Sequence, residues 1–166
     1  FGMGFGNWTF TEDATGTYRD DATDVEYVYG LKDLKVGDMP QANMALGFTV
    51  TPVEGANIQA LYRFYALHYA DWSPTSREGG DDNNQVWKTP SYGVLDIHAT
   101  YDLPMEIGPI KPSLFLHMFN ALDETYIQDA TDNSSYNAWS DTHSASDAEV
   151  FFGLPASFNL GLRVSF

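Results

Sequence analysis

The stretch that decides the fold is FNLGLRVSF, residues 158 to 166. Every second residue of this stretch is apolar, beginning at Phe158 and ending at Phe166. The residues between them are polar, charged or glycine: Asn159, Gly161, Arg163 and Ser165. Alternation with a period of two predicts a β-strand that has one apolar and one polar face. A bare apolar edge strand invites aggregation in water, so we expect other groups to cover this strand.

Five further segments have the character of strands, and helical periodicity is absent from the sequence. Three of them repeat the alternation. The segment 112–123 is apolar on both faces, which His117 and Asn120 interrupt, and the opening segment is glycine-rich and ambiguous about its buried face. Residues 42–52, for example, place Met44 and Phe48 on one face and Asn43 and Thr49 on the other. We therefore predict an all-β protein with antiparallel strands near residues 1–11, 42–52, 57–69, 91–102, 112–123 and 156–166.

The connections between these strands alternate between short and long. The short ones, 52–56 and 103–111, carry the Pro and Gly signals of turns. The long ones cover residues 12–41, 70–90 and 124–156. Structureless loops of more than about 15 residues are uncommon in compact soluble domains, whereas outer-membrane barrels have short periplasmic turns and long extracellular loops. The pattern favours an antiparallel transmembrane β-barrel, in which we expect residues 25–37 to extend the second strand above the membrane.

The distribution of charge agrees with this interpretation. The formal net charge is -15, which argues against nucleic acid as a partner because phosphate binding requires the opposite sign. The three long connections hold 18 of the 23 Asp and Glu residues. Within the strands, Arg63, Asp96 and Arg163 lie opposite the clearest apolar rows. An Arg in a lipid-facing row would cost about 2–4 kcal/mol near the bilayer midplane, although a soluble sandwich would place its charges in the same way.

The last strand has the length of a membrane crossing. Phe158 and Phe166 lie about 26 Å apart along a strand that rises about 3.3 Å per residue. A tilt of about 40° reduces this to about 20 Å of height, close to the separation of the aromatic girdles of such barrels. Tyr62, Phe64 and Tyr101 are candidates for the same girdles. The alternative is that these aromatic residues belong to an ordinary core.

The C-terminal half resembles the end of a TonB-dependent receptor of the Gram-negative outer membrane, in the style of the Bacteroidetes branch. The matching stretches are VGDMPQANMALGFTV (36–50), PSYGVLDIHATYDL (90–103), LFLHMFNALDETYI (114–127) and GLPASFNLGLRVSF (153–166). The third is similar to the family pattern Asn-Leu-Phe-Asp-x-x-Tyr, with Asn120, Asp123 and Tyr126 kept and Ala121 and Leu122 departing from it. The opening FGNWTFTEDA (5–14) is also similar to upstream strands of that branch.

The resemblance implies that the chain is the last quarter of a 22-stranded barrel, beginning at a periplasmic turn, with the plug domain absent from it. The final strand, with Phe158 and Phe166, then resembles the signal read by the barrel-assembly machinery. The implied activity is uptake of a large or scarce nutrient across the outer membrane: a siderophore, a glycan, cobalamin or a peptide. The implied partners are the remaining strands and plug of the same receptor, TonB through that plug, outer-membrane lipids and a surface lipoprotein.

Candidate ligand-binding residues lie in the long connections, where aromatic side chains stand beside polar groups. These are Trp72, Trp87, Tyr136, Trp139, Phe151 and Phe152. Aromatic faces beside Asp or Asn suit sugars and peptides, and the alternative is that they pack loop against loop. On the lumen side we predict a polar network of Arg63, Asp96, His98 and Arg163, with simple wall structure as its alternative.

The acidic residues of the loops offer hard oxygen ligands of the kind that Ca²⁺ prefers. The candidates are Asp81, Asp82, Asp129 and Asp132, but none has EF-hand spacing, so a solvated acidic loop is the favoured reading. We expect no other cofactor.

Enzymatic activity has no support in the sequence. The four His residues are scattered and form no zinc-binding motif, and the chain has no cysteine and no GxSxG, GxGxxG or P-loop motif. Asp141, His143 and Ser144 are close in the sequence, which does not establish triad geometry. Two other readings stay open: a porin or adhesin barrel, and a self-assembling β-protein whose open edges pair between copies.

Overall fold

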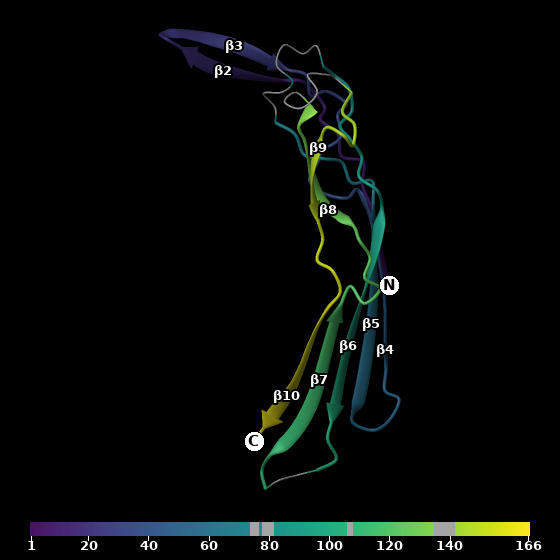
Figure 1. The fold of residues 1–166 in the computed structure, drawn as a ribbon. Helices are drawn as coiled ribbons and strands as arrows, with labels where there is room; N and C mark the ends of the chain where they lie inside the picture. Colours follow the sequence, from purple (N-terminus) through teal and green to yellow (C-terminus); the bar gives the residue numbers. More distant parts are fainter. Residues whose placement is uncertain (74–76, 78–81, 106–107, 135–141) are drawn as a thin grey trace.

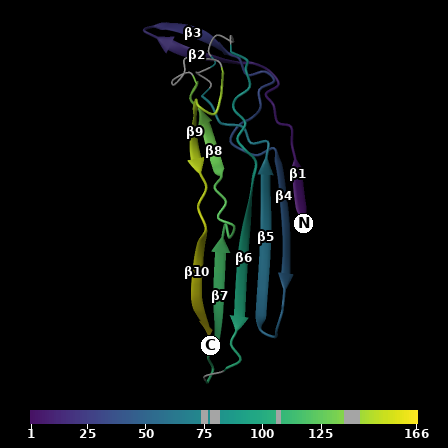
Figure 2. The ribbon, with the colours of Figure 1, turned by 45° about the vertical axis from the view of Figure 1, so that its right-hand side comes forward.

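Six strands form one antiparallel sheet in the computed structural model, which describes residues 1–73, 77, 82–105, 108–134 and 142–166. Their order across the sheet is β1 (Gly2–Phe5), β4 (Ala42–Val50), β5 (Ala56–Ala66), β6 (Tyr92–Asp102), β7 (Lys111–Phe119) and β10 (Ser157–Ser165). Figures 1 and 2 show these strands side by side in one twisted layer. The prediction of an all-β protein with antiparallel strands is therefore confirmed. The sheet itself is open, with β1 and β10 at its edges.

The first strand is shorter than the predicted segment 1–11. The regular pairing with β4 ends at Phe5, and the backbone N–H of Trp8 donates to the side-chain Oε1 of Gln41 at 3.2 Å. The indole of Trp8 folds back over Gly6, where a Cβ atom would lie 2.7 Å from the ring. Beyond this interruption the pairing recurs as an isolated antiparallel bridge between Thr9 and Lys35, where the N–H of Val36 donates to the carbonyl of Trp8 at 3.0 Å.

The prediction that residues 25–37 extend the second strand of the sheet is wrong. Residues from this region form β3 (Thr23–Tyr29), which pairs with β2 (Ala14–Asp20) in a separate hairpin. The two strands are joined by two residues, and Asp21 has a φ of 51°, as tight hairpin turns require. A second hairpin, β8 (Ile127–Asp132) with β9 (Ala148–Phe152), forms within the third long connection.

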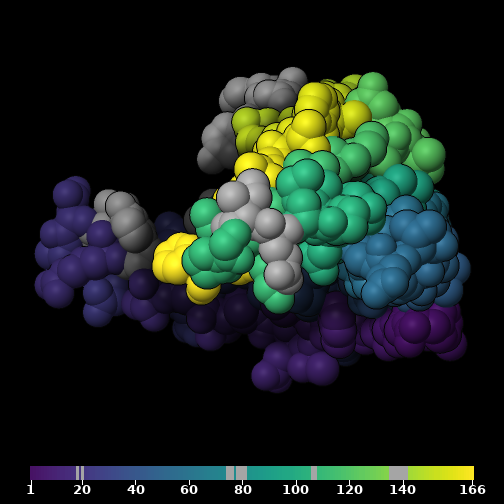
Figure 3. Space-filling view, turned by 90° about the horizontal axis from the view of Figure 1, so that it is seen from below, coloured from purple at the N-terminus to yellow at the C-terminus, as the bar shows by residue number. Residues whose placement is uncertain are grey.

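Short and long connections lie at opposite ends of the sheet. Figure 1 shows both hairpins above the sheet and the short turns below it. Seen from below, the β4–β5 turn in blue, the β6–β7 turn in green and the end of β10 in yellow lie side by side (Figure 3). Gly55 closes the first of these turns with a φ of 79°, in the left-handed region that glycine adopts without strain.

The register between strands confirms that every apolar row lies on one face. Phe158 lies opposite Met118, Met118 opposite Ile97, Ile97 opposite Ala60, and Ala60 opposite Phe48. Following all the rows across the sheet defines the apolar face: Met3 and Phe5; Met44, Leu46, Phe48 and Val50; Ile58, Ala60, Tyr62 and Phe64; Leu95, Ile97, Ala99 and Tyr101; Leu114, Leu116 and Met118; Phe158, Leu160, Leu162 and Val164. The described strands carry no charged side chain on this face.

The apolar face is uncovered in this chain. Phe158 and Leu160 are each 70% exposed, and Phe48 is 62% exposed. The buried apolar cluster lies instead among the long connections, where Leu31, Leu34, Trp72 and Val86 pack together. This distribution is the reverse of that in a soluble β-sandwich, in which the apolar faces of two sheets are buried against each other.

None of the described segments is a helix long and apolar enough to cross a bilayer.

Candidate functional site

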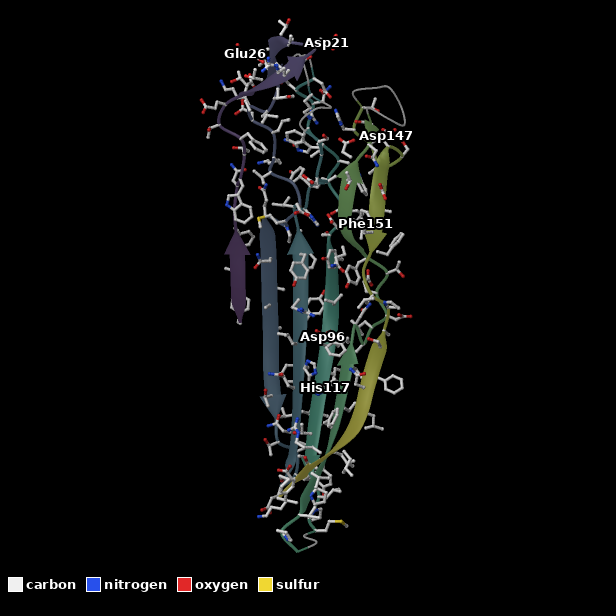
Figure 4. All side chains as sticks on the ribbon, turned by 90° about the vertical axis from the view of Figure 1, so that its left-hand side faces the viewer. Asp21, Glu26, Asp96, His117, Asp147 and Phe151 are labelled. Atoms are coloured by element: carbon white, nitrogen blue, oxygen red, sulfur yellow. The ribbon has the colours of Figure 1, made fainter. Side chains whose placement is uncertain are left out.

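The opposite face of the sheet carries the predicted polar residues. Arg63 of β5, Asp96 and His98 of β6 and Arg163 of β10 all lie on it. Figure 4 shows Asp96 and His117 on the sheet, below the hairpins that carry Asp21, Glu26 and Asp147. The predicted division of the side chains into an apolar and a polar face is therefore present. The four polar residues, however, do not form one connected network.

Asp96 joins three strands at the upper part of this face. Its carboxylate forms an ion pair with the guanidinium of Arg63 on β5. Its other oxygen accepts the backbone N–H of Asn120, at the end of β7, at 3.0 Å. The side chain of Asp96 is 7% exposed and that of Arg63 is 39% exposed. Because the buried carboxylate has both a cationic partner and a backbone donor, its charge is compensated within the sheet.

The motif residues Asn120, Asp123 and Tyr126 build the joint between β7 and β10. Asn120 ends β7 with a φ of 48°, a left-handed conformation that Asn tolerates better than most residues. Its side-chain amide donates to the carbonyls of Glu124 at 2.9 Å and Leu154 at 3.1 Å. Its side-chain oxygen accepts the N–H of Glu124 at 3.0 Å. Asn120 is 4% exposed, so the hydrogen bonds of its side chain are made in a dry environment.

The other two motif residues complete the same joint. The carboxylate of Asp123 accepts the N–H of Ala156, immediately before β10, at 2.9 Å. The carbonyl of Tyr126 accepts the N–H of Gly153 at 2.9 Å, and its ring lies where a Cβ at position 153 would be, at 1.9 Å. The motif therefore has a structural role in this chain: it holds the start of β10 against the end of β7.

A cleft opens beside this joint. Its volume is about 330 Å³, and Arg63, Asp96, Asn120, Tyr126, Gln128 and Pro155 are among the residues that line it. An adjoining pocket shares Arg63, Tyr126 and Gln128 with this cleft and is also lined by Tyr65 and Tyr92. The ring centroids of Tyr65 and Tyr92 are 5.2 Å apart, and those of Tyr92 and Tyr126 are 4.4 Å apart. Aromatic faces beside one ion pair and two amide side chains can contact the flat or ring-shaped part of a polar ligand.

A second polar feature lies lower on the same face. His98 of β6 and His117 of β7 are directly opposite each other, and their Nδ1 atoms are 2.8 Å apart. Sequence analysis predicted a role for His98 and did not pair it with His117. The signal was present, since both histidines lie on the polar face and are nearly equidistant from the middle of the 103–111 turn.

The long connections pack against one another and bury one of the predicted ligand-binding aromatics. Trp72 is 8% exposed and belongs to the apolar cluster with Leu31, Leu34 and Val86. Phe10 meets it edge to face at a centroid distance of 5.7 Å, and the guanidinium of Arg77 lies 5.1 Å from its ring centroid. For Trp72 the structure therefore supports the loop-packing alternative.

The remaining aromatic candidates are placed differently. Trp87 is half-buried, whereas Phe151 and Phe152 on β9 are 48% and 64% exposed and remain available for contact with a ligand or partner. Figure 4 shows Phe151 above the upper ends of β7 and β10. Tyr136 and Trp139 lie outside the described residues.

Two of the predicted acidic ligands meet at an imidazole. Nε2 of His143 is 2.7 Å from a carboxylate oxygen of Asp82, and Nδ1 of His143 contacts Asp132. The hydroxyl of Ser134 is 2.9 Å from the same Nδ1. Since Asp82 comes from one long connection and the other residues from another, this buried cluster fastens two loops together.

The metal predictions have no further support. Asp129 accepts the N–H of Ala130, and Asp81 lies outside the described residues. Among the residues whose placement is described, no group of three or more His, Cys, Asp or Glu side chains is arranged to hold a metal ion. Calcium binding by the acidic loops stays a prediction.

Burial perturbs two cationic groups in the loops. It lowers the pKa of His68, against the opposing influence of Asp129 and Asp38. It also lowers the pKa of the Arg77 guanidinium, which Asp82 and Asp132 raise in turn. Hydrogen bonds from the hydroxyl and backbone N–H of Ser144 lower the pKa of Asp147. None of these three groups lines the cleft.

The chain matches no protein-family model, no curated protein and no solved structure. The resemblance to TonB-dependent receptors therefore rests on the motifs of the sequence alone.

Proposed function

We propose that this chain forms one sector of the wall of an outer-membrane β-barrel, with its apolar face toward lipid and its polar face toward the lumen. The observation that carries the proposal is the apolar face. The five longer strands, about 4.8 Å apart and about 30 Å long, present roughly 700 Å² on one side. The largest apolar patch of a typical soluble monomer is about 300–600 Å². Hydrocarbon is the environment in which exposure of such an apolar surface carries no free-energy penalty.

The open edges support the same proposal. β1 and β10 each have a neighbour on one side, and unpaired backbone groups cannot be left in a bilayer. Six strands are also too few to enclose a plugged lumen, because barrel diameter grows with strand number. Barrels of this family have 22 strands. In the proposed barrel both edges pair with the remaining strands, and the barrel-assembly machinery inserts the complete barrel into the outer membrane.

The proposed activity is TonB-dependent uptake of a nutrient that porins do not admit. It is supported by the motif stretches and by their structural roles at the joint of β7 and β10. In this account the plug domain of the same receptor contacts TonB, and this chain supplies wall, lumen lining and loops. The cleft beside Arg63 and Tyr126 and the exposed Phe151 and Phe152 are its candidate contacts with the ligand or a surface lipoprotein.

Edge-to-edge self-assembly is a second candidate, and the two open edges favour it. A water-soluble assembly of this kind leaves the apolar face exposed unless a second layer covers it. The two candidates therefore differ in their need for detergent: the wall sector requires detergent or lipid to remain dispersed, and the assembly does not.

The test uses the complete gene product in its native host. Cells with and without the gene, and with and without TonB, are given ⁵⁵Fe-loaded siderophores, cobalamin, or fluorescent oligosaccharides and peptides. We expect the protein in the outer-membrane fraction and accumulation of one probe class that requires both the gene and TonB. Gene-dependent uptake that persists without TonB would identify a porin instead. Recovery of the protein in the aqueous fraction would refute the membrane wall.

A further inference from the structure

His98 and His117 occupy the centre of a polar row that crosses four strands. Gln59 on β5 lies opposite His98, and Asn159 on β10 lies opposite His117. The four side chains therefore belong to one line on the polar face, with neighbouring positions about 4.5–5.5 Å apart at Cβ. No apolar residue interrupts this row from β5 to β10.

The two imidazoles present their nitrogens to each other. The Nδ1 atoms are 2.8 Å apart, and the ring planes meet at 63°. Metal–imidazole bonds are about 2.0–2.1 Å long. Two such nitrogens lie about 2.9 Å apart at a bond angle of 90° and about 3.3 Å apart at the tetrahedral angle. The observed separation therefore fits two adjacent ligands of a tetragonal ion better than two ligands of a tetrahedral one.

The surroundings hold both rings in place. Phe119 meets the ring of His98 at a centroid distance of 5.6 Å, and Phe115 meets that of His117 at 5.3 Å. Both phenyl rings belong to β7 and lie on either side of His117. Pre-positioned ligands lose little rotamer entropy when an ion binds. The row is also only half-buried, so an ion and its water ligands can reach it.

The charges around the row are few. Asp96 lies two residues from His98 and is already paired with Arg63. The guanidinium of Arg163 lies 5.9 Å from the centroid of Phe115, on the side of the row toward the short turns. Neither charge is a ligand at these positions. The donors that remain near the histidines are the amide groups of Gln59 and Asn159, which supply neutral oxygen.

We propose that His98 and His117 form a bidentate site for a divalent transition-metal ion, with Cu²⁺ preferred over Ni²⁺ and Zn²⁺. Imidazole suits all three ions, Cu²⁺ and Ni²⁺ favour tetragonal geometry, and Cu²⁺ binds most tightly in the general affinity series. The ion lies between the two Nδ1 atoms in place of their direct contact, and water fills its other coordination positions. The proposal for this site uses only residues of the polar face, and it does not depend on the proposed transport activity.

The test uses the complete protein that carries this chain, purified in detergent and titrated with CuCl₂. Electron paramagnetic resonance counts the imidazole nitrogens bound to Cu²⁺ through their hyperfine coupling. The variants are H98A, H117A and the double variant, with H68A as a matched control because His68 lies in the loops. H98Q and H117Q provide a second pair that keeps a polar side chain of similar size. Heat-modifiable mobility in gels verifies that each variant is folded.

The expected result is a signal with two coupled nitrogens in the wild type and in H68A, and one in each single variant at 98 or 117. Each of those single variants should bind Cu²⁺ at least about tenfold more weakly, since loss of an outer-shell partner already costs 10–100-fold. The site is refuted if the folded variants at 98 and 117 retain the wild-type affinity, or if the Cu²⁺ signal shows oxygen ligands without nitrogen coupling.

Discussion

Replacing Leu162 by Arg distinguishes lipid from water at the apolar face. Leu162 lies four residues from both Phe158 and Phe166, at the middle of β10, and is 58% exposed. If the face meets hydrocarbon, the substitution should cost about 2–4 kcal/mol, since Arg near the bilayer midplane carries that penalty. The folding equilibrium should then fall by about 30- to 700-fold. If the face meets water, an exposed substitution should change stability by less than about 0.5 kcal/mol.

The matched control is N159R, which places the same side chain on the polar face of the same strand. The native Arg163 shows that β10 accepts an arginine there. The assay is folding of the complete barrel into liposomes, followed by tryptophan fluorescence and gel mobility across a urea series. We expect L162R to be strongly destabilised and N159R to lie within about 1 kcal/mol of the wild type. Equal effects of the two substitutions would refute the assignment of the faces.

Three further predictions concern the joint and the loops. N120A leaves the N–H of Glu124 and two carbonyls without their partner, so it should lower the free energy of unfolding by about 1–3 kcal/mol in the same urea assay; no change would show that the joint contributes nothing. G153A forces a methyl group against the ring of Tyr126 and should cost about 1–3 kcal/mol. Adding Y126A should recover much of that cost in a double-mutant cycle, and strict additivity would contradict the close contact. Because burial lowers the pKa of His68, the unfolded loops bind a proton that the folded loops do not, so loop stability should fall as the pH drops below about 6.5. Limited proteolysis between pH 7.5 and 5 should show this loss in the wild type and a smaller one in H68Q, and equal pH profiles would contradict it.

The faces and the order of the strands could be predicted from the sequence because both are local properties. The direction of a side chain in a strand depends on whether its position is odd or even, and Pro and Gly signal the short turns. The six predicted segments accordingly differ from the observed strands mainly at their ends, and most at β1, where Trp8 folds back over Gly6.

The interior of the long connections could not be predicted in the same way. The alternation in residues 25–29 indicated a strand but not its partner, and the local β2–β3 hairpin forms instead of an extension of the sheet. The contacts of His143 with Asp82 and Asp132 join residues up to 61 positions apart. Trp72 looked like an exposed binding residue, because its burial depends on Leu31, Leu34 and Val86 from other segments.

The most direct test of the central claim is a nitroxide scan of β10. The chain contains no cysteine, so single cysteines can be introduced and labelled at each position from 157 to 165 except Gly161, on which the ring of Phe115 lies. Collision rates with oxygen and with a water-soluble nickel complex are measured on the complete protein in liposomes. We predict that oxygen dominates at positions 158, 160, 162 and 164 and the nickel complex at 159, 163 and 165. Equal access of the nickel complex to both sets would contradict a wall with lipid on one side.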